Sequence, residues 1–194
     1  MFTGIVEEVG TVNKISPRKD LVILEIEAKK ILEDVQRGDS IAVDGVCLTL
    51  SEKKPKTLVF EVMNYTLKNT TLGYLKVMQK VNLERSLKIQ DRISGHFVLG
   101  HIDCIGLIRK RAYQGGNLYF EILIPKESMK YCLPKGSVAV DGISLTIAKT
   151  TAYTFTVYIL PCTLENTTLF YKNPSSKVNI EFDILAKAVL NIKK

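Results

Sequence analysis

Short apolar runs separated by turn-forming residues dominate the chain. Residues 21–27 and 118–124 combine β-branched, aliphatic and aromatic side chains, a composition typical of β-strands. Two further runs, 40–43 and 46–50, are split only by Asp44-Gly45, a dipeptide that favours a tight hairpin turn. Turn signals recur about every 8–12 residues, the spacing of a small all-β barrel or sandwich. The same pattern predicts strands at residues 57–63, 80–84, 154–160 and 177–181.

These runs belong to a sequence repeat with an offset of 97 residues. The segment SIAVDGVCLTL (40–50) returns as SVAVDGISLTI (137–147), with seven of eleven positions identical. A repeat of this length is a domain-sized unit, so each copy should fold around its own core. The other blocks that return in the same order are TLKNTTL (66–72) as TLENTTL (163–169), VNLE (81–84) as VNIE (178–181), and GIVEEVG (4–10), one residue out of register, as GHIDCIG (100–106).

The repeat predicts two domains, residues 1–96 and 97–183, followed by a C-terminal segment, residues 184–194. Each copy has five to six predicted strands, and closure into a barrel would remove exposed strand edges. Short helical turns are expected at residues 29–35 and 126–132. The last segment predicts a helix outside the repeat, and a partner subunit is a natural place to bury its apolar face. That face consists of Ile184, Leu185, Ala188, Val189 and Ile192.

The charge of the chain does not indicate a nucleic-acid partner. The formal net charge is +7, with 27 Lys and Arg against 20 Asp and Glu. The basic residues are scattered, often beside acids, whereas nucleic-acid binders gather them into a patch with stacking aromatic residues. A mildly basic, solvated surface is therefore the favoured interpretation.

Cysteine spacing and hydropathy exclude other classes. The four cysteines form no CxxC pair, and two histidines cannot complete a zinc site of ordinary spacing, so no metal site is expected. No apolar run approaches the roughly 20 residues that a membrane-spanning helix requires. The first residues lack the basic and apolar regions of a secretory signal. We therefore expect a cytoplasmic protein without membrane contacts.

The repeated motif Asp-Gly-x-(Cys/Ser)-Leu-Thr carries the most suggestive chemistry. In a strand after the turn, residues i and i+2 share a face, so Cys47 and Thr49 point the same way, as do Ser144 and Thr146. One interpretation is that these small polar residues only satisfy backbone groups. Another is a pocket of hydroxyls, backbone amides and aliphatic side chains that suits a planar, heteroatom-rich ligand. The pattern offers no phosphate-binding glycine loop.

The two copies differ at positions that matter chemically. Cys47 corresponds to Ser144, and Ile5 corresponds to His101; Asp183 follows the second VNIE block, where the first copy has Ser86. Equivalent pockets with different side chains make sense if two molecules of one ligand must be held in different roles.

These motifs resemble the riboflavin synthases of the alpha-chain type, a family of lumazine-binding repeats. The resemblance rests on MFTGIVE at the start, GHFVLGHI at residues 95–102 and both Asp-Gly-x-(Cys/Ser)-Leu-Thr blocks. It implies an all-β fold of two tandem six-stranded Greek-key β-barrels plus a short C-terminal helix. It also implies a cofactor-free transferase of riboflavin biosynthesis. Two molecules of 6,7-dimethyl-8-ribityllumazine would exchange a four-carbon unit, giving riboflavin and 5-amino-6-ribitylamino-uracil.

The resemblance further implies where the two substrates bind in each active site. Catalytic candidates are Cys47, Ser144, Asp141, Asp183 and His101; the residues do not separate base from nucleophile. The first pocket would contain Gly4, Ile5, Val6, Cys47, Leu48, Thr49, Glu61, Val62, Met63, Asn64, Tyr65 and Thr66. The second would contain Gly100, His101, Ile102, Ser144, Leu145, Thr146, Tyr158, Ile159, Leu160, Pro161, Cys162 and Thr163, with Lys135 reaching in at the interface.

The resemblance also implies partners and one alternative function. It implies a homotrimer held together by the C-terminal helices, with each active site shared between two subunits, and leaves open a complex with lumazine synthase. The alternative is a non-catalytic antenna protein of the same fold that binds lumazine or flavin. Such a protein needs one competent pocket, whereas both pocket blocks are intact here. An RNA-binding barrel would need a basic face.

Overall fold

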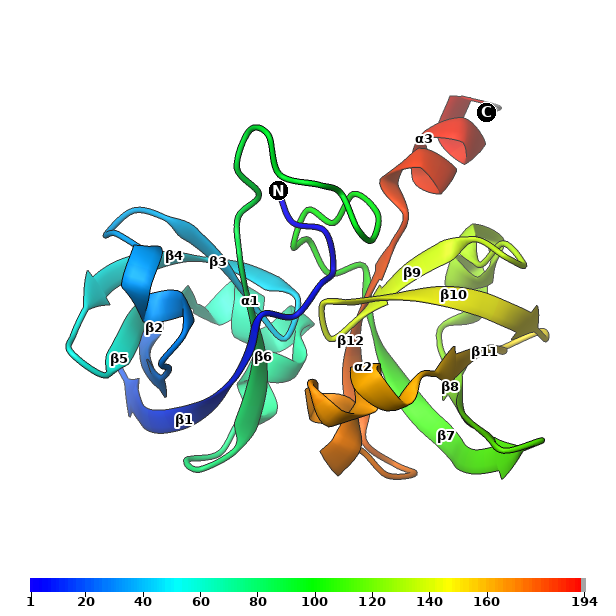
Figure 1. The fold of residues 1–194 in the computed structure, drawn as a ribbon, viewed down its shortest axis with the longest axis horizontal. Helices are drawn as coiled ribbons and strands as arrows, with labels where there is room; N and C mark the ends of the chain where they lie inside the picture. The colour runs from blue at the N-terminus through cyan, green and yellow to red at the C-terminus, as the bar shows by residue number, and fades with distance from the viewer. Residues whose placement is uncertain (193–194) are drawn as a thin grey trace.

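The chain folds into two β-barrels followed by a C-terminal helix (Figure 1). The computed structural model describes residues 1–192. The strands of the first barrel are β1 (Glu8–Pro17), β2 (Leu21–Glu27), β3 (Ser40–Val43), β4 (Val46–Lys53), β5 (Thr57–Met63) and β6 (Lys80–Arg85). Those of the second are β7 (Cys104–Gln114), β8 (Asn117–Leu123), β9 (Ser137–Val140), β10 (Ile143–Thr150), β11 (Thr154–Ile159) and β12 (Lys177–Phe182).

Both barrels have the same closed topology. The first is ordered β1-β2-β5-β4-β3-β6, and the second repeats this order as β7-β8-β11-β10-β9-β12. Placing β2 beside β5, next to the meander of β5, β4 and β3, makes a Greek key. Every pair in either ring is antiparallel. The expected fold of two six-stranded Greek-key barrels is confirmed.

Short helices connect the strands. The turns expected at residues 29–35 and 126–132 are 3-10 helices, whereas the two short α-helices within the repeats were not predicted. One or two helical turns are too short to show a 3.6-residue periodicity in the sequence. The helices are η1 (Ile31–Asp34), α1 (Asn64–Asn69), η2 (Thr71–Tyr74), η3 (Lys126–Tyr131), α2 (Pro161–Glu165), η4 (Thr168–Tyr171) and α3 (Ile184–Ile192).

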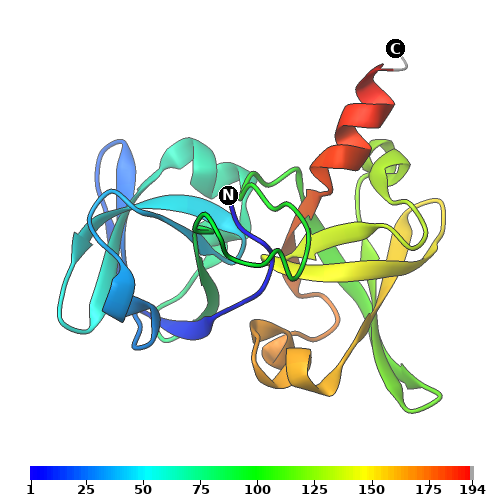
Figure 2. The same ribbon diagram turned by 45° about the horizontal axis from the view of Figure 1, so that its top comes forward.

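The helix α3 follows the second barrel and projects from the molecule (Figures 1 and 2). It matches the helix predicted at residues 184–194 as far as residue 192, and residues 193–194 lie outside the described residues. None of the helices within residues 1–192 is long and apolar enough to cross a lipid bilayer. The strands of the barrels lie on either side of the proposed boundary at residue 96.

Each barrel has a separate apolar core. Leu50, Phe60 and Leu83 are buried in the first, and Phe120, Ile147 and Phe155 in the second. Alternate residues along the strands point inward to these cores, as the period of two in a β-strand requires. The core therefore occupies the lumen of each barrel, and the outward positions remain available for other contacts.

The two Asp-Gly turns pack against each other between the barrels. Asp44 and Gly45 have φ angles of 43° and 79°, and Asp141 and Gly142 have 46° and 77°, which is the geometry of a type I′ hairpin turn. A Cβ atom on Gly45 would lie 2.5 Å from the backbone nitrogen of Gly142. Glycine is therefore required because the two backbones touch.

Two buried asparagines connect the barrels across this contact. The Nδ2 atom of Asn82 donates to the Asp141 carbonyl at 2.9 Å, and its Oδ1 accepts from the Thr168 amide at 2.8 Å. Asn179 repeats both bonds in the opposite direction, to the Asp44 carbonyl at 2.8 Å and from the Thr71 amide at 2.7 Å. The repeated VNLE and VNIE blocks thus hold the barrels together through paired polar groups.

A buried charge cluster lies at the same contact. Asp44 and Asp141 are both inaccessible to solvent, and the Lys172 ammonium lies 2.6 Å from Asp141 Oδ2. The first copy has Leu75 at the position of Lys172, so only one carboxylate has a cationic partner on its own barrel. Burial, together with repulsion from Asp141, raises the pKa of Asp44 to about 7.

The raised pKa predicts that Asp44→Asn removes a pH dependence of stability. The folded state holds a proton on Asp44 where the unfolded state has released it, so unfolding free energy should fall as pH rises from about 4 to about 7. Asp44→Asn keeps the acceptor for the Asn82 amide without the charge. The variant should match the parent near about pH 4 and exceed it by ~4 kcal/mol near about pH 8, measured by urea unfolding.

Asp20→Asn, at an exposed turn, is the matched control. It should leave the pH dependence of the parent unchanged. Equal stability of Asp44→Asn and the parent across this pH range would contradict the assignment of the proton to Asp44.

Candidate functional site

Two segments exchange between the barrels. Each segment precedes the first strand of one barrel and covers part of the surface of the other barrel. Residues 1–6 precede β1, and residues 96–103 precede β7. They pair with each other through Phe2 and Val98, whose backbone hydrogen bonds are 2.7 and 3.1 Å long. Val6 then packs against the core of the second barrel, and Ile102 packs against the core of the first.

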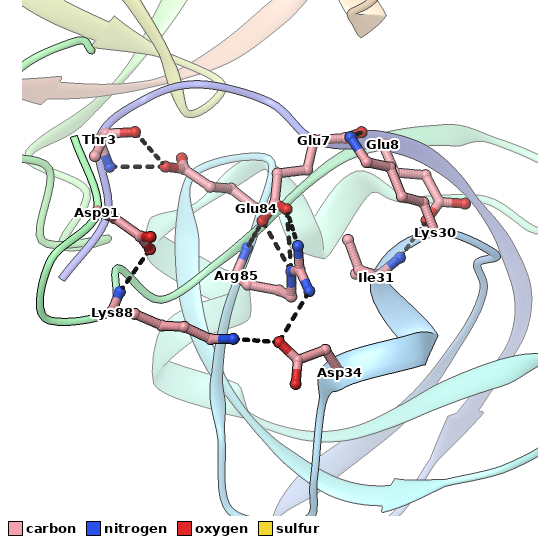
Figure 3. A network of polar contacts seen from close by, with 10 residues as sticks. All are labelled: Thr3, Glu7, Glu8, Lys30, Ile31, Asp34, Glu84, Arg85, Lys88 and Asp91. Atoms are coloured by element: carbon pink, nitrogen blue, oxygen red, sulfur yellow. Dashed lines mark hydrogen bonds and ion pairs between the residues drawn. The ribbon is translucent and has the colours of Figure 1, made fainter. Parts of the chain in front are cut away.

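Buried glutamates anchor the two segments. Glu84 of β6 accepts hydrogen bonds from the amide and hydroxyl of Thr3 and from the amide of Gly4, at 2.7–3.1 Å. Glu181 of β12 accepts three amide hydrogen bonds from residues 99–101, at 2.7–3.0 Å. Figure 3 shows Glu84 reaching Thr3. Burial raises the pKa of both carboxyls even though these donors oppose the shift.

The first candidate pocket lies on β4, where residues 100–102 cross it. The Cys47 amide donates to the Gly100 carbonyl at 2.9 Å. Gly100 has a φ of 81°, and a Cβ atom there would lie 2.5 Å from Cys47 Cβ, so only glycine permits the approach. A cavity of about 560 Å³ opens beside this contact. The predicted site residues that line it are Cys47, Tyr65, Thr66, Gly100, His101 and Ile102.

The second candidate site repeats the backbone contact of the first on β10. The Ser144 amide donates to the Gly4 carbonyl at 2.8 Å, and a Cβ atom on Gly4 would lie 2.7 Å from Ser144 Cβ. His96 adds a side-chain contact to this site, because its Nδ1 lies 2.7 Å from Ser144 Oγ. The Nε2 atom of His96 is buried and has no hydrogen-bond partner within the described residues.

The structure corrects the grouping expected from the sequence. Residues 4–6 were assigned to the first pocket and residues 100–102 to the second, but Gly4 lies on Ser144 and Gly100 lies on Cys47. The cause is the exchange of the two segments between the barrels. Position in the repeat indicates which barrel anchors a segment, and not which barrel it covers.

Strand alternation separates the predicted site residues into two sets. Four lie in the barrel cores and face away from a ligand on the outer surface, namely Leu48, Val62, Leu145 and Ile159. Their neighbours Cys47, Thr49, Glu61, Met63, Ser144, Thr146, Tyr158 and Leu160 occupy the outward positions. The candidate site therefore lies on the outside of each barrel.

The strand ladder ends at the same place in both barrels. Pairing of β4 with β5 ends at Leu50 and Phe60, and pairing of β10 with β11 ends at Ile147 and Val157. The outward residues Thr49 and Glu61, which come next, lie beyond the last pair. Backbone groups at such a ladder end can bind a ligand.

Several predicted residues have roles that differ from the expected ones. The Asp141 carboxylate binds the Asn179 amide at 2.7 Å and Lys172, so we assign it a structural role and withdraw it as a catalytic candidate. Lys135 lies in a turn with a φ of 66° and is exposed. The Tyr158 hydroxyl donates to Gln114 Oε1 at 3.2 Å. The exposed or half-buried residues at the edges of the two sites are Ile5, Asn64, Pro161, Cys162 and Thr163.

His96 was missed as a site residue. The sequence contains two histidines five residues apart, and alignment of the repeats favoured His101 because it corresponds to Ile5. His96 lies in the connection between copies and has no counterpart to mark it. Burial lowers its pKa although the Asp183 carboxylate opposes the shift, so the imidazole is neutral at pH 7. The Asp183 side chain also accepts from the Leu185 amide at 2.9 Å.

Charged residues surround the segment that covers Ser144. A cavity of about 370 Å³ is lined by Ile5, Glu84, Arg85 and neighbouring polar residues. Arg85 forms a bidentate ion pair with Glu7, and Lys88 pairs with Asp34 (Figure 3). Within residues 1–192, no group of three or more His, Cys, Asp or Glu side chains could hold a metal ion.

Comparisons with known proteins agree with this architecture. The lumazine binding domain model matches residues 3–86 and again residues 99–183. The chain is 42% identical to riboflavin synthase of Actinobacillus pleuropneumoniae over 97% of its length and 88% of the relative. It is 41% identical to riboflavin synthase of Bacillus subtilis over 96% of its length and 87% of the relative.

A solved structure is similar over nearly the whole fold. LumP in complex with 6,7-dimethyl-8-(1'-D-ribityl) lumazine superimposes with a TM-score of 0.84 and is 26% identical. The match covers 94% of this chain and 99% of LumP. From the duplicated domain model and the extent of these identities, the chain belongs to the riboflavin synthase family of proteins with two lumazine binding domains.

Proposed function

We propose that the chain catalyses the riboflavin synthase reaction. Two molecules of 6,7-dimethyl-8-ribityllumazine exchange a four-carbon unit, which gives riboflavin and 5-amino-6-ribitylamino-uracil. The observation that carries this proposal is the pair of equivalent outer-surface sites, of which one holds Cys47 and the other the Ser144–His96 pair at 2.7 Å. A reaction between two identical substrates needs two similar binding sites with different chemistry.

The sites offer complementary contacts to a planar heteroaromatic ring. Backbone groups at the ladder ends after Leu50 and Ile147 can hydrogen-bond ring heteroatoms, and the outward Thr49 and Thr146 add hydroxyls. Aliphatic side chains of the crossing segments, such as Ile102 in the first cavity, can cover the ring. Positioning two such rings supplies much of the rate, because the reaction joins two molecules.

We assign proton transfer to the Ser144–His96 pair. A neutral imidazole can accept the Ser144 hydroxyl proton at Nδ1 and so activate the hydroxyl, or a water that it holds, for addition at C7 of the bound lumazine. The Asp183 charge stabilises the imidazolium that results, since it favours the protonated ring. The delocalised ring makes the 7-methyl protons of the second lumazine acidic, so a weak base is sufficient to remove one.

We also propose that the active enzyme is a homotrimer assembled through α3. Leu185 and Val189 are more than half exposed on one face of the helix, as is Ile192. An apolar cavity of about 320 Å³ lies between this helix and η3. A neighbouring subunit would cover this face and bring its first site against the second site of this chain. A complex with lumazine synthase and a cytoplasmic location stay predictions.

An antenna protein is the second candidate function. The similarity to LumP with bound lumazine favours it, because that structure shows the same fold binding the ligand. The Ser144–His96 pair has no role in a protein that only binds. Formation of riboflavin from lumazine distinguishes the two functions directly.

The first prediction from this site concerns turnover and binding. The chain should convert 6,7-dimethyl-8-ribityllumazine to riboflavin, followed by absorbance. Ser144→Ala should lower kcat by about 100-fold or more, because it removes the group whose proton is transferred. Lumazine affinity, measured by fluorescence titration, should change less than about threefold, since one hydroxyl contributes little to ground-state binding. Cys47→Ser should show the same split with a smaller loss.

Ser16→Ala at the end of β1 serves as the matched control, and its kcat should equal that of the parent. If the chain binds lumazine tightly without forming riboflavin, the antenna function is correct. A parallel loss of affinity and rate in Ser144→Ala would make Ser144 a contact residue and not a catalyst.

The second prediction concerns the pH profile. Because the pKa of His96 is lowered by burial, its base form persists below the usual value of about 6.5. The rate should therefore hold at about pH 6.5 and fall at lower pH as the ring takes up a proton. His96→Gln should lower kcat and abolish this acid limb. His101→Gln should keep the fall in rate at low pH. If His101→Gln loses this fall and His96→Gln keeps it, His101 and not His96 is the base.

The third prediction concerns assembly. Val189→Asp places a charge on the exposed apolar face of α3, so the trimer should dissociate because a buried, unpaired charge is costly. Sedimentation should then show monomers, and activity should fall although each chain stays folded by circular dichroism. Lys149→Asp, on an exposed strand position, controls for the added negative charge. Full activity in a monomeric Val189→Asp would contradict an active site shared between subunits.

A further inference from the structure

A second cleft between the barrels shares no lining residue with the cavity at Cys47. It is formed by the turns that lead into β6 and β12, which lie at the lower edge of Figure 1. Its volume is about 820 Å³, larger than the cavity at Cys47. Both barrels contribute corresponding residues, such as Tyr74 and Tyr171. The cleft therefore lies on the approximate two-fold axis that relates the repeats.

The lining of this cleft is strongly basic. Lys76, Lys80, Lys172 and Lys177 line it, and the described lining contains no Asp or Glu. Lys172 is paired with the buried Asp141, so three of the four ammonium groups have no carboxylate partner in the cleft wall. Like charges in one concave surface repel each other and create a positive potential. An anion bound there would relieve this repulsion.

Other contacts hold the ammonium groups of two of these lysines in place. The Lys177 ammonium lies 3.6 Å from the ring centroid of Tyr74 across the barrel contact, and Lys80 donates to Thr11 Oγ1 at 2.7 Å. An ammonium group has three donors, so each lysine keeps donors for a ligand while these contacts restrict its position. Lys80 and Lys177 occupy equivalent positions in the two repeats.

Two buried hydroxyls in the lining have no partner. Thr71 and Thr168 are 7% and 1% exposed, and neither Oγ1 atom makes a hydrogen bond with any group in residues 1–192. Both residues line the cleft. A buried hydroxyl without a partner costs free energy, and an anion oxygen that reaches these hydroxyls from the cleft would supply the missing partner at both equivalent positions.

We propose that this cleft binds a small anion carrying two or three linked phosphate groups. Hydroxyl and ammonium donors together match phosphate oxygens, and three lysines without a carboxylate partner exceed what one phosphate needs. The volume admits a chain of phosphates with or without an attached base. A nucleic-acid duplex is disfavoured because the basic residues gather within a concave cleft and not along an open face. The inference does not depend on the proposed activity.

The test is calorimetric titration of the whole chain with inorganic tripolyphosphate and, separately, with adenosine 5'-triphosphate. At about 150 mM salt, where exposed charges are screened, each variant is compared with the parent chain. Lys80→Gln combined with Lys177→Gln should weaken binding by about tenfold or more. Thr71→Val combined with Thr168→Val should weaken it by about threefold or more, while the melting temperature does not fall, because valine fills the same volume.

Lys53→Gln combined with Lys56→Gln provides the matched control. These lysines lie at the far end of the first barrel, and the double variant should bind within about twofold of the parent. Equal affinities for the two probes would indicate that phosphate alone is recognised. A tighter complex with the nucleotide would indicate that the base also contacts the cleft, for example through Tyr171.

Three outcomes would overturn the proposal. The first is the absence of saturable binding by either probe. The second is an equal loss of affinity in the control and cleft lysine variants, since that would mean non-specific attraction to a basic surface. The third is unchanged binding by the threonine variant, because the hydroxyls would then have no ligand. Tighter binding of a short oligonucleotide than of either probe would also contradict a small-anion site.

Discussion

The backbone contact between the two Asp-Gly turns is the constraint on which the rest of the structure depends. Because Gly45 and Gly142 touch without side chains, the barrels approach closely enough for Asn82 and Asn179 to bind backbone groups of the opposite barrel. A Cβ atom at either glycine would separate the turns and break both asparagine bridges. A motif that looks like a local hairpin signal is thus also the joint of the whole molecule.

Close approach of the barrels explains how the candidate sites are built. Residues 1–6 and 96–103 can reach the opposite barrel only because the barrels are close enough for a segment of a few residues to span the gap. Glu84 and Glu181 fix the point from which each segment crosses. Each site therefore combines a strand of one barrel with a segment anchored on the other. A single barrel on its own would present Cys47 or Ser144 without its covering glycine.

The sequence predicted the barrels well and the sites only in part. Strands were evident because apolar runs, Asp-Gly turns and the repeat all agree locally. The exchange of segments could not be predicted, since Gly4 and Gly100 look the same to a local pattern whichever barrel they cover. His96 was missed for a related reason, because its partner Ser144 is distant in the sequence. Asp141 was predicted to be catalytic because the sequence does not show that its carboxylate is buried in the contact between the barrels.

Symmetry explains which positions could diverge after duplication. Asn82 and Asn179 each bind the opposite copy, so a change in one leaves polar groups unpaired in both. The two copies are accordingly nearly identical in these blocks. Outward residues such as Cys47 and Ser144 lie against the crossing segments and take no part in the asparagine bridges, and they differ. Lys172 is the exception inside the joint: its ammonium pairs directly with Asp141, and burial together with repulsion from Asp141 places the proton on Asp44. The repeat is therefore symmetric where the barrels hold each other, and asymmetric in the charge of the joint and in the chemistry of the two sites.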